Sequence, residues 1–343
     1  MSEAGILYKL VDNLFKEPAP FRHEYRYLGH RVWIECADQV LFNHVVSMMV
    51  NLDYLPVAIP ATPRIARICF VPSIKGLVDA LPATPPRHVQ NAGLGQFMVL
   101  EYEHAVLAGF EDVGMVVVMD DGRLAGLVHR PSFEGPSGEN RNLGAMVQVM
   151  LVELLQNIGC FTIHAGGVSG HQGAHLWSGP SGSGKTTQIL RLANAGWRFL
   201  GDDQVLLERD VAGNWCVWPY WRDVAVSRDT WQLHPFLQQR IPEPDRDKKS
   251  LVSVKRLCGD LSIASYPLAA VHFIDRDQQS RHDKLSPNDA IRFLGESFMH
   301  YLWSRRAGPV LDLMLDLASR VPMYSVSQGY CNRAAQPYWD NPL

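Results

Sequence analysis

The run of residues 179–187 constrains the fold of this chain more than any other segment. It has the sequence GPSGSGKTT and satisfies the pattern G-x-x-x-x-G-K-[ST] of a phosphate-binding loop. An apolar segment, 174–177, precedes it, and a helical pattern of apolar residues follows it up to Gly196, a residue type common at helix ends. The sequence therefore predicts a strand, a loop and a helix in this order, as in an α/β fold.

This loop has the chemistry needed to bind the phosphates of a nucleoside triphosphate. Glycines let backbone N–H groups turn inward, and the helix N-terminus adds partial positive charge, so the segment can form an anion cradle. Lys185 is expected to reach the β- and γ-phosphates, and Thr186 to place its hydroxyl on Mg²⁺. The predicted nucleotide-binding residues are Gly179, Pro180, Ser181, Gly182, Ser183, Gly184, Lys185, Thr186 and Thr187.

Two acidic residues and a histidine flank the loop in the sequence. Asp202 and Asp203 follow the short apolar segment 197–200, and His164 stands upstream of the loop. Two adjacent acids beside Mg²⁺ would offer both a base for a substrate hydroxyl and a ligand for the metal. Structural roles are also open, because the acidic pair suits a polar turn between two strands and His164 suits a strand end.

Together, the loop, the histidine and the acidic pair resemble the HPr kinase/phosphorylase family, which shares the nucleotide-binding core of phosphoenolpyruvate carboxykinases. The resemblance covers residues 160–208. It implies a kinase domain with a mixed β-sheet that uses ATP or GTP and Mg²⁺. It makes Asp202, His164 and Lys185 catalytic, with Asp202 as the carboxylate that accepts the hydroxyl proton and His164 orienting or pairing with that acid. It places the metal on Thr186, Asp203 and Asp202.

The chain departs from that family in two places. Thr186-Thr187 stand where the bifunctional HPr enzymes usually carry Ser-Glu, and no Gly-rich, Arg-containing signature follows between Asp203 and Tyr266. The second departure weakens the expectation of a phosphorylase reaction. The predicted activity is transfer of the γ-phosphate to a hydroxyl of a protein, a peptide or a small molecule, and this acceptor need not be HPr.

Two alternatives remain open. The apolar run 268–274 ends in Asp275, which an ordinary P-loop ATPase would use as the Walker B carboxylate on Mg²⁺. We expect the acidic pair to hold the metal instead, since Asp275 also suits a charged turn that ends a buried strand. The second alternative is a regulatory protein that binds nucleotide, hydrolyses it slowly or not at all, and signals through its N-terminal domain.

Composition limits the partners and the compartment. A formal net charge of -3 argues against nucleic acid or a membrane surface as a partner. The six cysteines contain no C-x-x-C pair, which suits a reducing cytoplasm. The N-terminus lacks a signal pattern and no apolar run reaches about eighteen residues, so we expect a cytoplasmic protein. A homo-oligomer is possible if the tail after Ser327 packs on a neighbouring subunit.

The 343 residues, 47% of them hydrophobic, suffice for two domains. Residues 1–138 are predicted to form an N-terminal α+β domain, and 139–343 the HPr-kinase-like P-loop domain. The boundary is the Gly- and Pro-containing segment 133–141. An apolar helix over 143–158 is expected to be buried against both domains.

Shorter patterns predict the remaining elements. In the first domain they are a helix over 6–15, strands over 25–34 around a turn, and a hairpin of 115–119 with 124–128 closed by an Asp-Gly turn. In the second they are a hairpin of 205–207 with 215–217, helices over 290–303 and 310–318, and a strand over 323–326. A polar loop brings Arg246, Lys248 and Lys249 as candidates for stabilising the transferring phosphate.

Overall fold

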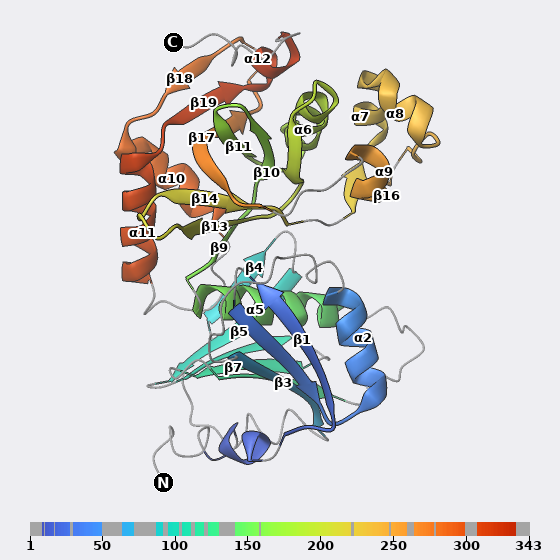
Figure 1. Ribbon diagram of the computed structural model, residues 1–343, viewed down its shortest axis with the longest axis vertical. Helices are drawn as coiled ribbons and strands as arrows, with labels where there is room; N and C mark the ends of the chain where they lie inside the picture. The colour runs from blue at the N-terminus through green and yellow to red at the C-terminus, as the bar shows by residue number, and fades with distance from the viewer. Residues whose placement is uncertain are drawn as a thin grey trace. The chain divides into compact units, whose positions relative to one another are not determined.

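The computed structural model (Figure 1) describes residues 9, 11–16, 18–27, 30–49, 64–71, 87–91, 95–102, 105–110, 114–119, 123–129, 141–157, 159–220, 223–246, 248–258, 264–277, 279–298 and 307–333. The chain divides into two compact units. The first contains Met1–Ile158 and His300–Arg305, and the second contains Gly159–Met299 and Arg306–Leu343. The helices and strands confirm the expected mixed α/β class.

The division falls after Ile158, whereas the sequence placed the domain boundary between residues 138 and 139. Helix α5 (Arg141–Asn157) accounts for this difference, because it packs on strands β3, β7 and β8 of the first unit. Its apolar residues are buried, as the pattern of the helix predicts, and the expected burial against the second domain stays a prediction. The predicted linker, residues 133–141, lies outside the described residues except for Arg141, which begins α5.

The first unit is built on one mixed eight-stranded sheet with the order β1-β2-β3-β8-β7-β6-β5-β4. Its strands are β1 (Phe21–Tyr27), β2 (His30–Cys36), β3 (Arg64–Val71), β4 (Arg87–Asn91), β5 (Gly95–Tyr102), β6 (Ala105–Phe110), β7 (Gly114–Met119) and β8 (Leu124–His129). Strand β3 is parallel to both of its neighbours, and the other pairs are antiparallel. Helix α2 (Gln39–Met49) packs on β1, β2 and α5.

Both predicted hairpins of this unit are present. Strands β1 and β2 pair in the region predicted over 25–34, and β7 pairs with β8 around the predicted Asp-Gly turn, whose residues 120–122 lie outside the described residues. Every residue of β7 is buried, since its β-branched run lies in the middle of the sheet and α5 packs on it. Of the helix predicted over 6–15, residues 9 and 11–15 are described and helical.

The second unit is built on a nine-stranded mixed sheet, whose main path is β12-β10-β11-β17-β14-β13-β9, with β19 beside β17 and β18 beside β19. These strands are β9 (Phe161–Ile163), β10 (Gly166–Gly170), β11 (Gly173–Ser178), β12 (Arg198–Gly201), β13 (Val205–Arg209), β14 (Trp215–Trp218), β17 (Tyr266–Asp275), β18 (His282–Lys284) and β19 (Met323–Ser327). Strand β17 runs parallel to β11 and to β19. The predicted hairpin of 205–207 with 215–217 is the pair β13–β14.

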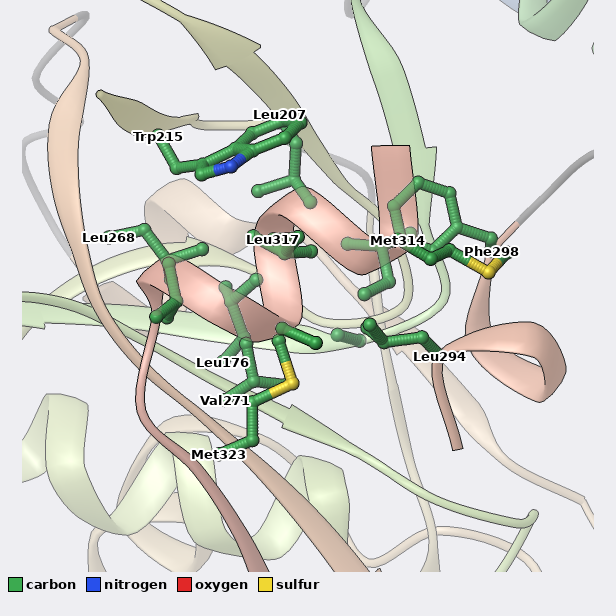
Figure 2. Close-up of a cluster of buried hydrophobic side chains, with 14 of the residues drawn as sticks. Leu176, Leu207, Trp215, Leu268, Val271, Leu294, Phe298, Met314, Leu317 and Met323 are labelled. Carbon is green, nitrogen blue, oxygen red and sulfur yellow. The ribbon is translucent and has the colours of Figure 1, made fainter. Parts of the chain in front are cut away.

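Helices cover both faces of this sheet (Figure 1). Helix α6 (Lys185–Asn194) packs on β10, β11 and β12, while α10 (Pro287–Ser297) and α11 (Ala307–Arg320) pack together on the other face. Figure 2 shows this second core, in which Leu176, Val271 and Met323 from three adjacent strands meet Leu294 and Leu317 from the two helices. Side chains alternate between the two faces of the sheet along a strand, so the residues next to these in sequence point toward the face that α6 covers.

Smaller elements complete the second unit. A two-stranded sheet of β15 (Val224–Val226) and β16 (Ser250–Val252) carries helices α7 (Arg228–Leu233), α8 (Pro235–Arg240) and α9 (Val254–Cys258). Helix α10 ends at Ser297, short of the predicted residue 303, because Phe298 is extended and bridges to Ile163. The predicted helix over 310–318 and strand over 323–326 are α11 and β19. Of the predicted tail, residues 328–333 form α12 (Gln328–Arg333), and 334–343 lie outside the described residues.

Candidate functional site

The phosphate-binding loop leaves strand β11 at Ser178 and enters helix α6 at Lys185. Gly179 has φ 145°, and a Cβ atom there would lie 2.4 Å from the carbonyl oxygen of Ile274, so only glycine fits. Gly184 is the N-cap of α6 with φ 101°, and it offers no side chain to cap the helix. The first N–H groups of α6 are therefore left for an anion, the arrangement expected of a phosphate cradle.

The Lys185 side chain folds back over this loop. Its Nζ donates hydrogen bonds to the carbonyl oxygens of Gly179 at 2.7 Å and Pro180 at 3.3 Å. Burial lowers the pKa of Lys185, while the charges of Asp203 and Asp202 oppose that effect. The ammonium group is thus bound to two carbonyl oxygens of the loop and influenced by the charges of the acidic pair.

A second cation, Arg276, also contacts the backbone of the loop. Arg276, which directly follows strand β17, donates a hydrogen bond through Nη2 to the Ser181 carbonyl oxygen at 2.5 Å. This contact turns the carbonyl of that peptide toward Arg276, and the N–H of the same peptide belongs to Gly182. Arg276 therefore helps to fix the loop backbone, a role that no pattern in the sequence indicates.

Asp202 is a buried carboxylate beside the loop helix, with 8% of its surface exposed. Burial raises its pKa to about 6, although hydrogen bonds from the Thr186 side chain and the Ala225 backbone act in the opposite direction. Its Oδ1 atom is buried without a hydrogen-bond partner within the described part of the chain. Since a buried acceptor without a partner is costly, this oxygen fits a metal ion or a substrate hydroxyl.

Asp203 has a different environment from its neighbour. Its side chain is 71% exposed, and its Oδ1 lies 3.8 Å from His164 Nδ1. His164 therefore contacts Asp203, whereas the sequence suggested that it orients or pairs with Asp202. The difference arises because Asp202 is buried under the loop helix while Asp203 points outward.

The position of His164 is fixed by its backbone. Its N–H donates to the Ser297 carbonyl oxygen at 2.7 Å, and its own carbonyl accepts a hydrogen bond from Ser178 Oγ at 2.9 Å. Burial lowers the pKa of the imidazole, and the negative charge of Asp203 opposes that shift. A neutral, partly exposed ring at this place can accept or donate a hydrogen bond.

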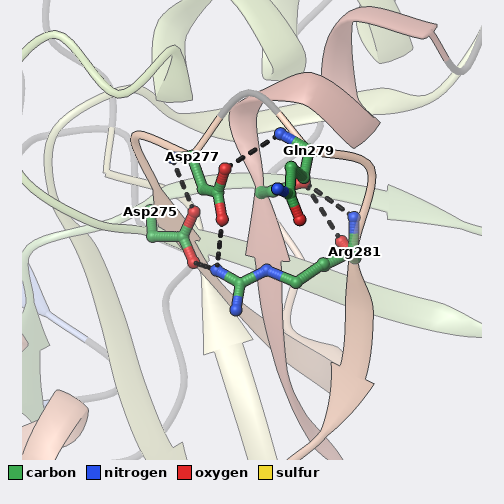
Figure 3. A network of polar contacts seen from close by, with 5 residues as sticks. Asp275, Asp277, Gln279 and Arg281 are labelled. Carbon is green, nitrogen blue, oxygen red and sulfur yellow. Dashed lines mark hydrogen bonds and ion pairs between the residues drawn. The ribbon is translucent and has the colours of Figure 1, made fainter.

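The competing metal carboxylate, Asp275, is occupied by other partners (Figure 3). Its Oδ2 pairs with Arg281 Nη2 at 2.8 Å, and its Oδ1 accepts the Asp277 N–H at 2.9 Å. Asp277 Oδ2 also pairs with Arg281 at 3.1 Å. Both oxygens of Asp275 thus belong to a charged turn after β17, which favours the acidic pair over Asp275 as the metal site.

The donors near the loop suit Mg²⁺ held together with phosphates. Over the described ranges, no group of three or more His, Cys, Asp and Glu side chains could hold a metal ion by itself. Magnesium bound with a nucleotide commonly takes only one or two carboxylates, along with waters and phosphate oxygens. The Thr186 hydroxyl and the unpartnered oxygen of Asp202 fit this pattern.

Lys249, one of the three basic residues of the predicted loop, influences the charged groups of the site. The charge of Lys249 lowers the pKa of both Asp202 and Lys185, and this residue directly precedes strand β16. Strand β16 pairs with β15, whose Ala225 contacts the Asp202 carboxylate. No comparable interaction places Arg246 or Lys248 at the site within the described residues, so their roles stay predictions.

No helix among the described segments is long and apolar enough to cross a membrane.

Comparison with known proteins adds little to this geometry. No family model and no curated protein sequence matches the chain. Among solved structures, it is similar to the HPr(Ser) kinase/phosphatase from Coxiella burnetii, with a TM-score of 0.27 and 11% sequence identity over 48% of this chain and 83% of that chain. A similarity of this size carries no argument about chemistry, so the function is inferred from the residues of the site.

Proposed function

We propose that this chain is a Mg²⁺-dependent phosphotransferase of the HPr-kinase-related type. It would move the γ-phosphate of ATP or GTP to a hydroxyl of a protein, a peptide or a small molecule. The observation that carries the proposal is the buried Asp202 carboxylate beside Thr186, with its pKa raised to about 6. A base with a pKa near neutrality is suited to take the proton of a hydroxyl group.

The binding roles follow from the loop. Its inward N–H groups and the N-terminus of α6 would hold the phosphates, and Lys185 would exchange its contacts with the Gly179 and Pro180 carbonyls for contacts with phosphate oxygens. Thr186, Asp203 and Asp202 would hold Mg²⁺, which neutralises charge on the transferring group. His164 would keep Asp203 in place through their contact at 3.8 Å.

The proposed transfer uses Asp202 as the base. The acceptor hydroxyl gives its proton to Asp202 while its oxygen forms a bond to the γ-phosphorus. The bond from that phosphorus to the β–γ bridging oxygen breaks, and the nucleoside diphosphate leaves. Positioning and electrostatics carry most of the catalysis, because phosphoryl transfer needs little covalent chemistry from the protein. Lys249 adds positive charge on the side of Asp202 and Lys185.

The rival function is a nucleotide-binding regulatory protein that hydrolyses slowly or not at all, and Asp202→Asn separates the two. Asparagine has nearly the shape of aspartate but takes no proton, so we expect retained nucleotide binding and a transfer rate lower by about 10²–10⁴. Transfer of labelled γ-phosphate would be followed to water, to serine-containing peptides and to cell-extract proteins.

One control and one comparison accompany this experiment. Asp312→Asn, an exposed change on α11, should keep the wild-type rate. His164→Ala should cost less than Asp202→Asn, because the imidazole lies against Asp203 and is not the proposed base. Wild-type transfer in Asp202→Asn would contradict the role of the base. A wild-type protein that binds nucleotide and moves phosphate to none of these acceptors would favour the regulatory function.

A further inference from the structure

A chain of hydroxyl groups ties Thr187, the last residue of the phosphate-binding loop motif, to helix α7. Thr187 Oγ1 lies 3.0 Å from Thr230 Oγ1, which in turn lies 3.0 Å from Ser227 Oγ. Ser227 is the N-cap of α7 and accepts the Thr230 N–H at 3.2 Å. Thr230 is only 6% exposed, so its hydroxyl depends on these partners in place of water.

His234 makes a second contact with the same loop residue. Its Nε2 lies 3.1 Å from the carbonyl oxygen of Thr187. Burial and the nearby charge of Arg191 lower the pKa of His234, which leaves the ring neutral at about pH 7. A neutral ring that donates to this carbonyl carries its proton on Nε2. Thr187 is therefore held through both its side chain and its backbone.

The same segment also reaches the carboxylate of the site. Strand β15 directly precedes Ser227, and the Ala225 backbone hydrogen-bonds Asp202. Pairing with β16 along the whole length of β15 fixes that strand. Residues 224–234 thus contact both Asp202 and Thr187, the neighbour of Thr186.

We propose that Thr187, Thr230 and His234 are positioning residues that hold the first turn of α6 against residues 224–234, so that Thr186 and Asp202 keep their relative geometry. The inference rests on the proposed function and deepens it. It also gives a role to Thr187, which stands where the HPr enzymes usually carry Glu. A hydroxyl can both donate to and accept from Thr230, whereas an ionised carboxylate can only accept.

The test compares Thr187→Val, Thr230→Val and the double variant in the full chain. Valine keeps the branched shape of threonine and removes the hydroxyl. We expect each single variant to lose about tenfold to a hundredfold in kcat. Nucleotide KM should stay within about twofold, because the phosphate contacts themselves remain. More Mg²⁺ should be needed for half-maximal nucleotide binding. The double variant should be no worse than either single one, because the two residues share one interaction.

Three further measurements keep a structural effect apart from a positioning effect. Thr187→Ser and Thr230→Ser retain the hydroxyl and should restore both kcat and the Mg²⁺ midpoint. Ser286→Ala removes the N-cap hydroxyl of α10, away from the site, and should leave both unchanged. In the nucleotide-free protein, Thr230→Val should speed amide hydrogen exchange at Gln188, whose N–H donates to the Gly184 carbonyl oxygen, and at Ala225.

Wild-type kcat and Mg²⁺ midpoints in both valine variants would overturn the inference. So would losses that multiply in the double variant, or an equal loss in Ser286→Ala. If the wild-type chain transfers phosphate to no acceptor, the proposed function fails. The Mg²⁺ midpoint and the hydrogen exchange still decide the positioning role in that case, because both are measured without turnover.

Discussion

Lys185 Nζ lies 2.7 Å from the carbonyl oxygen of Gly179, so the lysine of the phosphate-binding loop closes the loop on itself. Burial lowers the pKa of the same group, and the charges of Asp203 and Asp202 oppose that shift. This cation therefore has two backbone carbonyl oxygens as hydrogen-bond partners and is also influenced by the charges of the acidic pair.

Lys185→Ala should weaken triphosphate binding by about 1.5–3 kcal/mol, because charge-assisted contacts to phosphate are lost. Isothermal titration with ATP and with GTP in the presence of Mg²⁺ measures this change. Lys255→Ala, an exposed lysine on α9, serves as the control and should bind as the wild type does. Unchanged affinity for both nucleotides in Lys185→Ala would remove the phosphate-loop assignment.

The two candidate metal carboxylates should respond differently to neutralisation. Asp203→Asn should raise the Mg²⁺ concentration needed for turnover, because it removes a charge from the proposed metal site. Asp275→Asn should leave that requirement unchanged, since both oxygens of Asp275 are engaged by Arg281 and Asp277. Metal titrations of nucleotide turnover compare the two. The reverse order would indicate an ordinary Walker-type ATPase.

The transfer rate should depend on the ionisation of Asp202. Its pKa is raised to about 6, mainly by burial, and a general base must be ionised to accept a proton. The rate should therefore fall about tenfold for each pH unit below the pKa of Asp202, which bound Mg²⁺ would bring below 6, and stay level above it. Nucleotide binding measured in the same buffers separates a loss of transfer from a loss of affinity. If the residual rate of Asp202→Asn kept the same dependence on pH as the wild type, Asp202 would be excluded as the base.

The ionised carboxylate of Asp202 should also lower the stability of the protein at the pH at which this residue acts as a base. Folding raises the pKa of this carboxyl from 3.8 to about 6, so its contribution to stability is present below the lower value and is lost as pH rises through the higher one. Asp202→Asn should thus increase the free energy of unfolding at about pH 7.5 by on the order of 1–3 kcal/mol. This gain should shrink toward zero at about pH 4.

Urea unfolding of both proteins at the two pH values provides the measurement. Wild-type and variant curves that differ equally at the two pH values would show that ionisation of Asp202 plays no part. Asp312→Asn, whose side chain is exposed, should show no such dependence on pH.

The sequence by itself determined the local features of the site. The strand, loop and helix over β11 and α6 follow from glycines that take positive φ and from an apolar helical pattern, and both depend only on near neighbours. The hairpins β7–β8 and β13–β14 could be predicted for the same reason, since turn residues between two short apolar runs specify them locally.

Tertiary structure decided what those residues can do. Asp202 and Asp203 are adjacent and chemically identical, yet Asp202 is buried with a raised pKa while the Asp203 side chain is 71% exposed, because burial depends on what packs against each side chain. His164 contacts Asp203 and not Asp202. Helix α5 belongs to the first unit because it packs on strands β3, β7 and β8 of that unit. Thr187 and Thr230 stand 43 positions apart, and no local pattern could show that their hydroxyls meet, since only the folded chain brings α6 and α7 together.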